Sequence, residues 1–530
     1  MPLQALPTEI QSQIFSHLIV SYGPSPIHSV LRTCRQLYQV ALPLSVQIFR
    51  NTAPLSASGG PCSKARNTQF LHYILVSKPE LAKYIETLIF GIFSSSDCED
   101  EHEASIPVDV SIYEQRIKSM LGAATFRDYK PECSRWIADL RRGSTDAQVA
   151  LILLTCPNVK SLCFEEPEGA QNVLFLLRLS RTLSSSARPT KIPVSNLREV
   201  YGEATHKNFG YKMGSQEVSA LLALPSLRSY EIALAGSRRE PEKALASLPS
   251  RFSSIEELTL YRSYVSGSVI NSLISACKHL RSFVFTRGLY GLPEPYMQAR
   301  DIMEAILPHA ATLENLHLNL DDDWYQKGPP QRLYMGTELR RMVALKKLRI
   351  GMRALTGMLD AHPHGTHGAE VLYEIDGAPR LTECLPENLE HLVIHGCGRN
   401  ILDQAHELLR VIQNEGRFSH LECIHFLFNH ENIDPSEVQL RPGIPKPRLL
   451  VVFQDDRSRV FDSGPPHPME DEGRSARTIV SRIYSADYRE LWLGRRGGFS
   501  MALWQPPASK DGAIYDNPFV GRFEEFFMAS

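Results

Sequence analysis

The chain has 530 residues, 43% hydrophobic and 22% charged, proportions that are typical of a folded globular protein and exclude wholesale disorder. Its 57 basic and 59 acidic side chains nearly cancel, and without a basic block the sequence does not predict nucleic-acid binding. No apolar run approaches the ~18 residues of a membrane span and no signal peptide is recognisable, so we expect an intracellular protein of the cytoplasm, the nucleus or both.

Residues 6–18, with the sequence LPTEIQSQIFSHL, predict a short amphipathic helix. Pro7 suits a helix start, and Thr8 and Gln11 have the spacing of a capping box. Residues 27–41 carry a second apolar face at helical spacing. Such short helices cannot bury enough surface alone, so they need either the following domain, which they would cap, or a second protein. The apolar stripe of the first helix recurs at every fourth position and consists of Leu6, Ile10, Ile14 and Leu18.

Two blocks near the start of the chain carry a recognisable motif. They read Leu6-Pro7-x-Glu9-Ile10-x-x-x-Ile14-x-x-x-Leu18 and Leu31-x-x-Cys34-Arg35-x-Leu37-Tyr38. This pattern, which spans residues 3–50, resembles the F-box, a small three-helix domain that docks on the Skp-type adaptor of cullin-RING ubiquitin ligases. Leu37-Tyr38 replaces the Trp that often follows the Cys-Arg pair. By motif position, the resemblance implies that the adaptor contacts Leu6, Pro7, Ile10, Ile14, Leu18, Leu31 and Cys34.

The body of the chain repeats one strand-like pattern, Leu-x-x-Leu-x-Leu with conservative apolar changes. Helix-like segments lie between many copies, at residues 218–224, 269–277, 301–310 and 405–413. A strand plus a helix at a spacing of about 25 to 33 residues resembles the leucine-rich repeat, whose stacked units share one core and a curved parallel sheet. The alternative is an unrelated α/β domain with leucine-rich parallel strands. The copies start at Val159, Leu227, Ile255, Leu280, Leu313, Leu345, Leu389 and Leu421, with degenerate copies expected at Ile85 and Leu197.

The two resemblances support each other, because F-box proteins commonly carry such repeats after the box. We therefore expect an α/β protein, in which a three-helix F-box precedes an irregular solenoid with parallel strands inside and helices outside. Aromatic residues near the C-terminus, including Trp492 and Phe527, predict a cap on the array. The expected domains are 1–50 (F-box), 51–150 (helical linker and first degenerate repeat), 151–430 (repeats) and 431–530 (cap, with a disordered loop near 455–475).

Strand alternation within the repeat predicts a binding surface for a protein target. The leucines face the core, and the intervening residues line the concave side of the sheet. This side is acidic early, basic at one repeat and rich in histidine near its end, so binding could change at about pH 6 to 7, where unperturbed histidines titrate. The alternative is an ordinary solvated strand face. The predicted target-binding residues are Glu256, Glu257, Tyr261, Arg281, Glu314, His317, Lys346, Lys347, Arg349, His391, His395 and His425.

No motif for catalysis or cofactor binding is recognisable: the chain has no phosphate-binding glycine loop, nucleophile elbow or zinc-binding helix. His362, His364 and His367 form the most metal-like stretch, but no helix or acidic ligand lies nearby, so we expect no metal and no cofactor. The 10 cysteines include no CxxC pair, and we expect them to be reduced. A hydrolase or transferase in the last hundred residues would need a motif that the chain lacks.

The resemblance implies a non-catalytic function in ubiquitin-dependent protein degradation. The chain would be the substrate-recognition subunit of an SCF (Skp–cullin–F-box) E3 ubiquitin ligase. The F-box would bind the Skp-type adaptor and, through it, the cullin-RING ligase, while the repeats would bind a protein target of unknown identity. The alternative is a leucine-rich-repeat scaffold for protein interactions without a ligase role. Neither function involves a nucleic acid or a membrane.

Overall fold

The computed structural model of the chain divides into two compact units. Unit 1 holds the described residues up to Leu162 and from Glu168 to Val173, and unit 2 holds residues 163–167 and the described residues from Leu174 onward. The structure describes residues 3–22, 25–51, 63–94, 110–168, 170–184, 193–203, 211–212, 215–233, 235–236, 245, 248–263, 265–287, 298–320, 332–357, 378–398, 400–428, 450–455 and 479–481.

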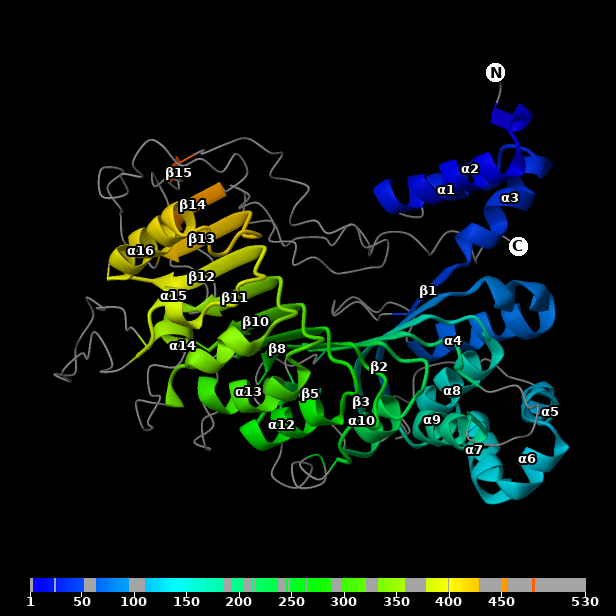
Figure 1. Ribbon diagram of the computed structural model, residues 1–530. Helices are drawn as coiled ribbons and strands as arrows, with labels where there is room; N and C mark the ends of the chain where they lie inside the picture. Colours follow the sequence, from blue (N-terminus) through cyan, green and yellow to red (C-terminus); the bar gives the residue numbers. More distant parts are fainter. Residues whose placement is uncertain are drawn as a thin grey trace, which may run out of the picture. The chain divides into compact units, whose positions relative to one another are not determined.

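Unit 1 begins with three short helices that pack on one another, which we call the N-terminal module (residues 3–45, Figure 1). The first long helix starts directly after Pro7, whose carbonyl accepts the N–H groups of Ile10 and Gln11 at 3.0 Å. The core of the module consists of Phe15, Ile27, Leu31, Leu37, Ala41 and Leu44. Its elements are η1 (Leu3–Ala5), α1 (Thr8–Tyr22), α2 (Ser25–Leu31) and α3 (Arg35–Ser45).

The rest of unit 1 combines parallel strands with helices. Strand β1 pairs with β2 from Ile48↔Thr87 to Asn51↔Phe90. Phe49 of β1 stacks on Phe70, with ring centroids 3.6 Å apart. The elements are β1 (Ile48–Asn51), α4 (Ser63–His72), a π-helix η2 (Tyr73–Ser77), η3 (Pro79–Tyr84), β2 (Thr87–Ser94), α5 (Val110–Leu121), α6 (Ala123–Asp128), α7 (Lys130–Arg142) and α8 (Thr145–Thr155). Strand β3 (Ser161–Glu168) spans the boundary between the units.

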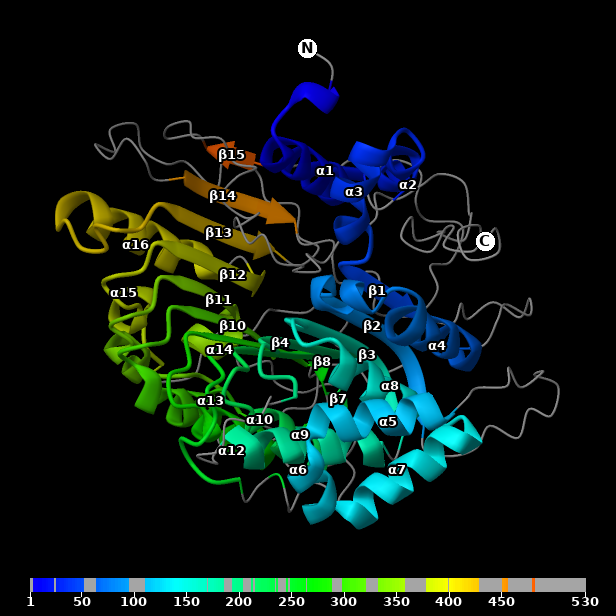
Figure 2. The same ribbon diagram turned by 90° about the vertical axis from the view of Figure 1, so that its right-hand side faces the viewer.

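Unit 2 is built on one sheet whose strands follow the order of the chain (Figure 2). Strands β4, β6 and β8 to β14 pair in parallel, and β15 adds antiparallel beside β14. The predicted parallel α/β arrangement is therefore confirmed. The strands are β4 (Glu199–Glu203), β6 (Ser229–Ala233), β8 (Glu257–Ser263), β9 (Ser282–Arg287), β10 (Asn315–Asn319), β11 (Lys347–Gly351), β12 (His391–Cys397), β13 (Cys423–Phe428), β14 (Leu450–Asp455) and β15 (Ile479–Ser481), with β5 (Tyr211–Lys212) and β7 (Ala235–Gly236) as a separate pair.

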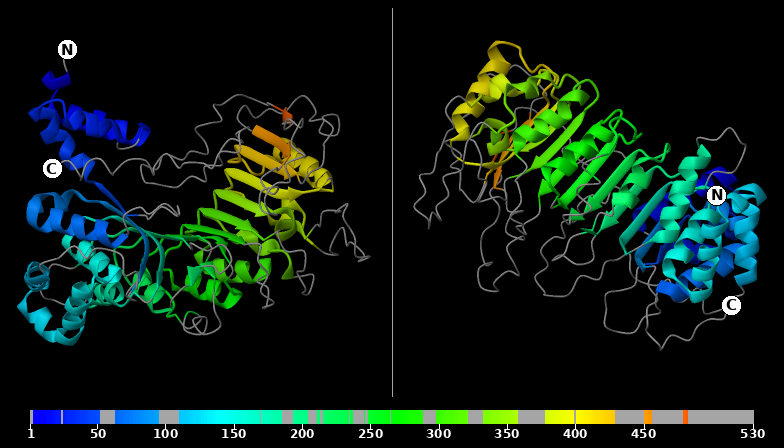
Figure 3. Two further views of the ribbon diagram at one scale, coloured as in Figure 1. Left: turned by 180° about the vertical axis from the view of Figure 1, so that it is seen from behind. Right: turned by 90° about the horizontal axis from the view of Figure 1, so that it is seen from below.

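Helices alternate with these strands and lie along one face of the sheet (Figure 3). The segments 218–224, 269–277, 301–310 and 405–413, predicted as helical, overlap α10, α12, α13 and α16. The helical elements are α9 (Gln171–Ser184), α10 (Ser215–Leu222), α12 (Gly267–Ala276), α13 (Ala299–Ile306), η4 (Leu307–His309), η6 (Thr337–Arg341), α14 (Met352–Thr356), α15 (Leu381–Cys384) and α16 (Ile401–Asn414).

The strand register aligns the apolar positions of successive copies into rows that form the core. One row is at most 1% exposed and consists of Leu258, Phe283, Leu316, Leu348, Leu392 and Ile424. Because successive side chains of a strand point to opposite faces, the residues between the rows lie on the other side of the sheet. We call this side, opposite the helices, the inner face.

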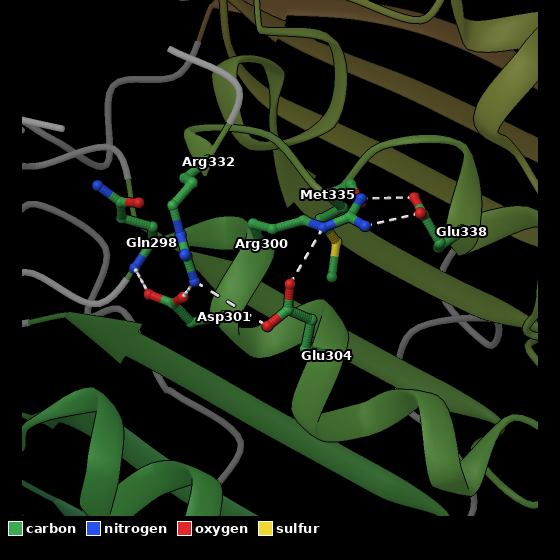
Figure 4. Close-up of polar contacts among 7 residues, drawn as sticks. All are labelled: Gln298, Arg300, Asp301, Glu304, Arg332, Met335 and Glu338. Atoms are coloured by element: carbon green, nitrogen blue, oxygen red, sulfur yellow. Dashed lines mark hydrogen bonds and ion pairs between the residues drawn. The ribbon is translucent and has the colours of Figure 1, made fainter. Parts of the chain in front are cut away.

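Ion pairs tie the helical layer together beside α13 (Figure 4). The guanidinium of Arg300 binds Glu338 through two hydrogen bonds, Nη1 to Oε2 at 2.5 Å and Nη2 to Oε1 at 2.6 Å. Asp301 accepts the backbone N–H of Gln298 at 3.1 Å, which forms the capping box of α13, and pairs with Arg332. Two stretches that follow the helix, around Arg332 and in η6, are thereby joined to it.

Some predicted features lie outside the described residues. They are the histidine loop at His362, His364 and His367, the disordered loop near 455–475, and all of the predicted cap except β14 and β15. Among the helices that the structure describes, none has the length and apolar character needed to cross a membrane.

Candidate protein-binding surfaces

The apolar stripe of α1 lies at the edge of the N-terminal module rather than in its core. Ile10 is 40% exposed and Pro7 is exposed as well, whereas Phe15 on the inward side of the helix is completely buried. Leu6, Ile14, Leu18 and Cys34 are half-buried. Of the seven residues that the resemblance expects to contact the adaptor, only Leu31, at 7% exposure, is a core residue of the module.

This edge is a candidate docking surface because it is apolar and accessible. Ile10 and Ile14 are one helical turn apart and therefore neighbours on the helix surface. Large exposed apolar side chains are few in the described part of the chain, and Ile10 is the one that lies in the N-terminal module. We refer to Leu6, Pro7, Ile10, Ile14 and Leu18 as the docking edge.

Gln11, next to the docking edge, does not have the role that its spacing predicted. A capping box would require its Oε1 to accept the backbone N–H of Thr8, but this oxygen is buried and, in the part of the chain that the structure describes, has no hydrogen-bond partner. Its Nε2 instead lies 2.8 Å from the carbonyl of Leu6 and 3.3 Å from the carbonyls of Leu3 and Gln4. The predicted capping box is therefore wrong, and Gln11 fastens the preceding segment to α1.

The inner face of unit 2 is the second candidate surface, and its register brings side chains of different charge into rows. One row across β4 to β13 reads Glu199, Ser229, Glu257, Ser282, Asn315, Lys347, His391 and Cys423, and the next reads Tyr201, Glu231, Thr259, Val284, His317, Arg349, Val393 and His425. Acidic residues thus lie on β4 to β8, basic residues on β11, and histidines on β10, β12 and β13. The predicted succession of charges is found on this face, with Tyr261 at the end of the acidic region.

Four of the predicted target-binding residues belong to a ladder of ion pairs where the strands begin. Glu256 lies 3.4 Å from Arg228 and 3.9 Å from Arg281, measured between nitrogen and oxygen. Arg281 binds Glu314 at 2.7 Å, and Glu314 lies 3.7 Å from Lys346. These charges neutralise one another, so they are less available to a partner than Lys347, which lies one residue further along the strand. We call the series Arg228, Glu256, Arg281, Glu314 and Lys346 the charge ladder.

The charge ladder could have been found in the sequence. Its members occupy the second position of successive Leu-x-x-Leu-x-Leu copies, and their signs alternate along the chain. In a parallel sheet with one strand per copy, equivalent positions become neighbours about 4.8 Å apart. Alternation in sign at one repeat position therefore indicates pairing between strands.

The surroundings of three inner-face histidines, His317, His391 and His425, disfavour the charged form of the imidazole. Burial, together with the charge of Arg349, lowers the pKa of His317 well below its ordinary value and that of His425 to about 4. Burial and Lys347 also lower the pKa of His391. His317 and His425 therefore stay uncharged between about pH 6 and 7, so the predicted pH response in that range is wrong for these two residues.

His395 is buried and serves the sheet itself. It is 2% exposed, and its Nε2 lies 2.9 Å from the carbonyl oxygen of Leu318 on β10. Gly351 of the intervening strand β11 is in register with His395, and without a side chain it leaves the space that the imidazole crosses. His395 therefore contributes to the fold rather than to an accessible binding surface.

Other buried polar groups in the described core serve the fold. The buried carboxylate of Asp146 accepts the backbone N–H groups of Asn172 at 2.7 Å and Val173 at 3.1 Å, and so caps the first turn of α9. Burial raises the pKa of the Cys277 and Cys384 thiols to about 12, which leaves them protonated and poorly nucleophilic at neutral pH. Within the described residues, no group of three or more histidine, cysteine or acidic side chains is arranged to hold a metal ion.

Comparison with known proteins adds no identity to these surfaces. No protein-family model matches the chain, and no curated protein matches its sequence. The function must therefore be inferred from the docking edge, the inner face and the motif that the N-terminal residues carry.

Proposed function

We propose that the chain is the substrate-recognition subunit of an SCF-type E3 ubiquitin ligase, with the N-terminal module as its F-box and unit 2 as a leucine-rich-repeat array. The observation that carries the proposal is the exposure of Ile10. The motif that resembles an F-box requires an apolar residue at this position to contact the adaptor, and the side chain is 40% exposed at the edge of a packed three-helix module.

The contribution of such a subunit is proximity and orientation rather than bond-making. The docking edge binds the Skp-type adaptor and so connects the chain to a cullin-RING ligase. The inner face of unit 2 binds the protein target and presents it to the ubiquitin-charged enzyme. Lys347 and Arg349 form a basic region on β11, and Glu257 and Glu231 form an acidic region on β8 and β6, three or more strands away. The target therefore meets two regions of opposite charge on the inner face.

The test is binding of the purified full chain to a purified Skp-type adaptor by titration calorimetry. The variant Ile10→Ala removes an exposed side chain, so it costs little folding free energy, but in the complex it leaves a cavity. Removing a large apolar side chain from an enclosed site costs about 2–5 kcal/mol, which corresponds to a loss of affinity of roughly 30-fold or more. Val76→Ala is the matched control, because Val76 is also exposed in unit 1 but lies outside the docking edge.

Two results would contradict the proposal. Either the adaptor does not bind the wild-type chain, or it binds Ile10→Ala and a Leu6/Pro7/Ile10 triple alanine variant as tightly as the wild type. In both cases the remaining function is that of an interaction scaffold, in which the N-terminal helices have no ligase role.

A further inference from the structure

Three backbone carbonyls of the segment Leu3–Leu6 converge on one side chain. The oxygens of Leu3, Gln4 and Leu6 lie within 3.3 Å of Nε2 of Gln11. An amide nitrogen carries two hydrogens, so three acceptors in reach show that the segment curls around this group. Leu6 is the first residue of the docking edge, and its carbonyl is the nearest of the three at 2.8 Å.

The same segment is fastened from its other side by α3. Nε2 of Gln36 donates to the carbonyl of Gln4 at 2.9 Å, and the amide of Gln4 lies 3.4 Å from Sγ of Cys34. The side chain of Leu3 packs against the core of the module. The segment is thus held between α1 and α3, and Pro7 and Ile10 follow it directly on the exposed edge.

The burial of Gln11 is costly, which makes a specific role necessary. The residue is completely buried, and its Oε1 has no hydrogen-bond partner among the described residues. An unsatisfied buried polar atom is destabilising, so an apolar side chain would pack here more favourably if packing alone mattered. Glutamine differs from an apolar residue in that its side-chain amide donates hydrogen bonds. The acceptors are the carbonyl groups of Leu3–Leu6, which precede α1 and therefore have no partner within that helix.

We propose that Gln11 is a positioning residue for adaptor binding: its amide holds Leu3–Leu6 against α1, so that Leu6 and Pro7 are presented in the docking conformation before the partner arrives. The inference rests on the proposed function, because it names the group that pre-organises the same docking edge. Pre-organisation strengthens binding by removing the cost of ordering the segment in the complex.

The test compares Gln11→Glu with Gln13→Glu in the full chain. Both substitutions preserve the shape of the side chain and add one negative charge to α1, but Gln13 is exposed, whereas Gln11 faces the three carbonyls. A carboxylate donates no hydrogen bond and repels carbonyl oxygens. Gln36→Ala, at an exposed residue, removes the second attachment with less risk to the fold. The readouts are adaptor affinity and hydrogen exchange of the Leu6 amide, which donates to the carbonyl of Leu3 at 3.2 Å.

We expect Gln11→Glu to weaken adaptor binding by about tenfold or more. Gln11→Glu should also accelerate hydrogen exchange of the Leu6 amide in the free protein. Gln36→Ala should change the adaptor affinity and the exchange rate in the same directions but by less, and Gln13→Glu should behave like the wild type in both measurements. Two results would overturn the role of Gln11 and leave the proposed function intact. Either Gln11→Glu binds the adaptor as tightly as the wild type does, or hydrogen exchange of the Leu6 amide is the same in Gln11→Glu and in the wild type. Absence of adaptor binding by the wild type would overturn the proposed function and, with it, the docking role of Gln11.

Discussion

Arg300 of α13 and Glu338 of η6 form an ion pair through two hydrogen bonds (Figure 4), and a Cβ added to Gly336 would meet both side chains. Arg300 also donates to the carbonyl of Met335 at 3.2 Å, so the guanidinium is anchored to side chain and backbone of the same stretch. A planar guanidinium that meets a carboxylate through two parallel bonds fixes orientation as well as distance. The pair therefore fixes η6, which precedes β11, against α13.

Gly336→Ala should destabilise unit 2 more than an ordinary glycine substitution. Gly336 has a φ of +80°, and an added Cβ would lie 2.6 Å from Nη1 of Arg300 and 2.7 Å from Oε2 of Glu338. The control is Gly416→Ala, which has a φ of +69° but no atom within 4 Å of the added Cβ. Both variants lose unfolding free energy through backbone strain, about 1–3 kcal/mol at Gly336, where a ψ of −174° gives a conformation that is essentially restricted to glycine, and only the first also breaks the ion pair. Urea denaturation measures the difference, and equal losses would show that the ion pair contributes nothing.

Reversal of one charge in the charge ladder should lower stability in a salt-dependent way. Arg281→Glu places a third carboxylate between Glu256 and Glu314, so attraction on both sides becomes repulsion. Exposed pairs contribute about 0.2–1 kcal/mol each, so we expect a loss of about 1 kcal/mol at low ionic strength that shrinks in about 1 M salt. The double variant with Glu314→Arg should recover part of the loss. Lys278→Glu, at an exposed residue outside the ladder, is the control, and an equal loss there would refute the pairing.

The strands were predictable from the sequence because each depends on a local pattern. Copies of Leu-x-x-Leu-x-Leu place apolar residues on alternate positions, and a row such as Leu258, Phe283 and Leu316 can be buried only if the copies stack in register. The helices between strands were predictable for the same reason, since α12 and α16 carry apolar residues at helical spacing. The type of each element and its place in the sheet follow from these short-range periodicities.

The roles of individual polar residues were not predictable, because they depend on contacts between segments far apart in the sequence. His395 was expected to line an accessible surface, but its partner is a carbonyl 77 residues away on β10, reached across Gly351. Gln11 has capping-box spacing, which predicts that its side chain accepts a hydrogen bond from a backbone N–H. Only the path of Leu3–Leu6 shows that the side chain instead donates to carbonyl oxygens of that segment. Periodicity indicates which face of an element is buried, but not which polar atoms meet there.

Lys346 and Lys347 should differ in their importance for target binding, although they are adjacent and carry the same charge. Lys346 pairs with Glu314 in the charge ladder, whereas Lys347 lies in the inner-face row between Asn315 and His391. If the target binds the inner face, Lys347→Glu should reduce the amount of target that co-purifies with the full chain, and Lys346→Glu should reduce it less. The measurement is quantitative mass spectrometry of the proteins bound to each variant. Retention of the same proteins in the same amounts by both variants would exclude this part of the inner face as the target site.

Stability should fall in mild acid because the inner-face histidines resist protonation. The pKa of His425 is lowered from 6.5 to about 4 by burial, followed by the charges of Arg349 and His391. In the unfolded chain the imidazole keeps its ordinary pKa, so between about pH 6.5 and 4 the unfolded state binds a proton that the folded state excludes. The stabilising effect is fully present above pH 6.5 and is lost as the pH falls towards 4. For His425 alone the loss between about pH 7.5 and pH 5 is about 2 kcal/mol, and the lowered pKa values of His317 and His391 act in the same direction.

The variant His425→Gln isolates this contribution, since glutamine keeps a polar side chain but does not titrate. Unfolding free energies from urea titrations at about pH 7.5 and pH 5 should differ by about 2 kcal/mol less in this variant than in the wild type. His406→Gln is the matched control, because His406 lies exposed on α16, outside the inner face. The same pH dependence in wild type and His425→Gln would mean that His425 is protonated in the folded protein as readily as in the unfolded chain. The inner face would then carry an additional positive charge at pH 5, and acid would strengthen its attraction for an acidic target rather than weaken the fold.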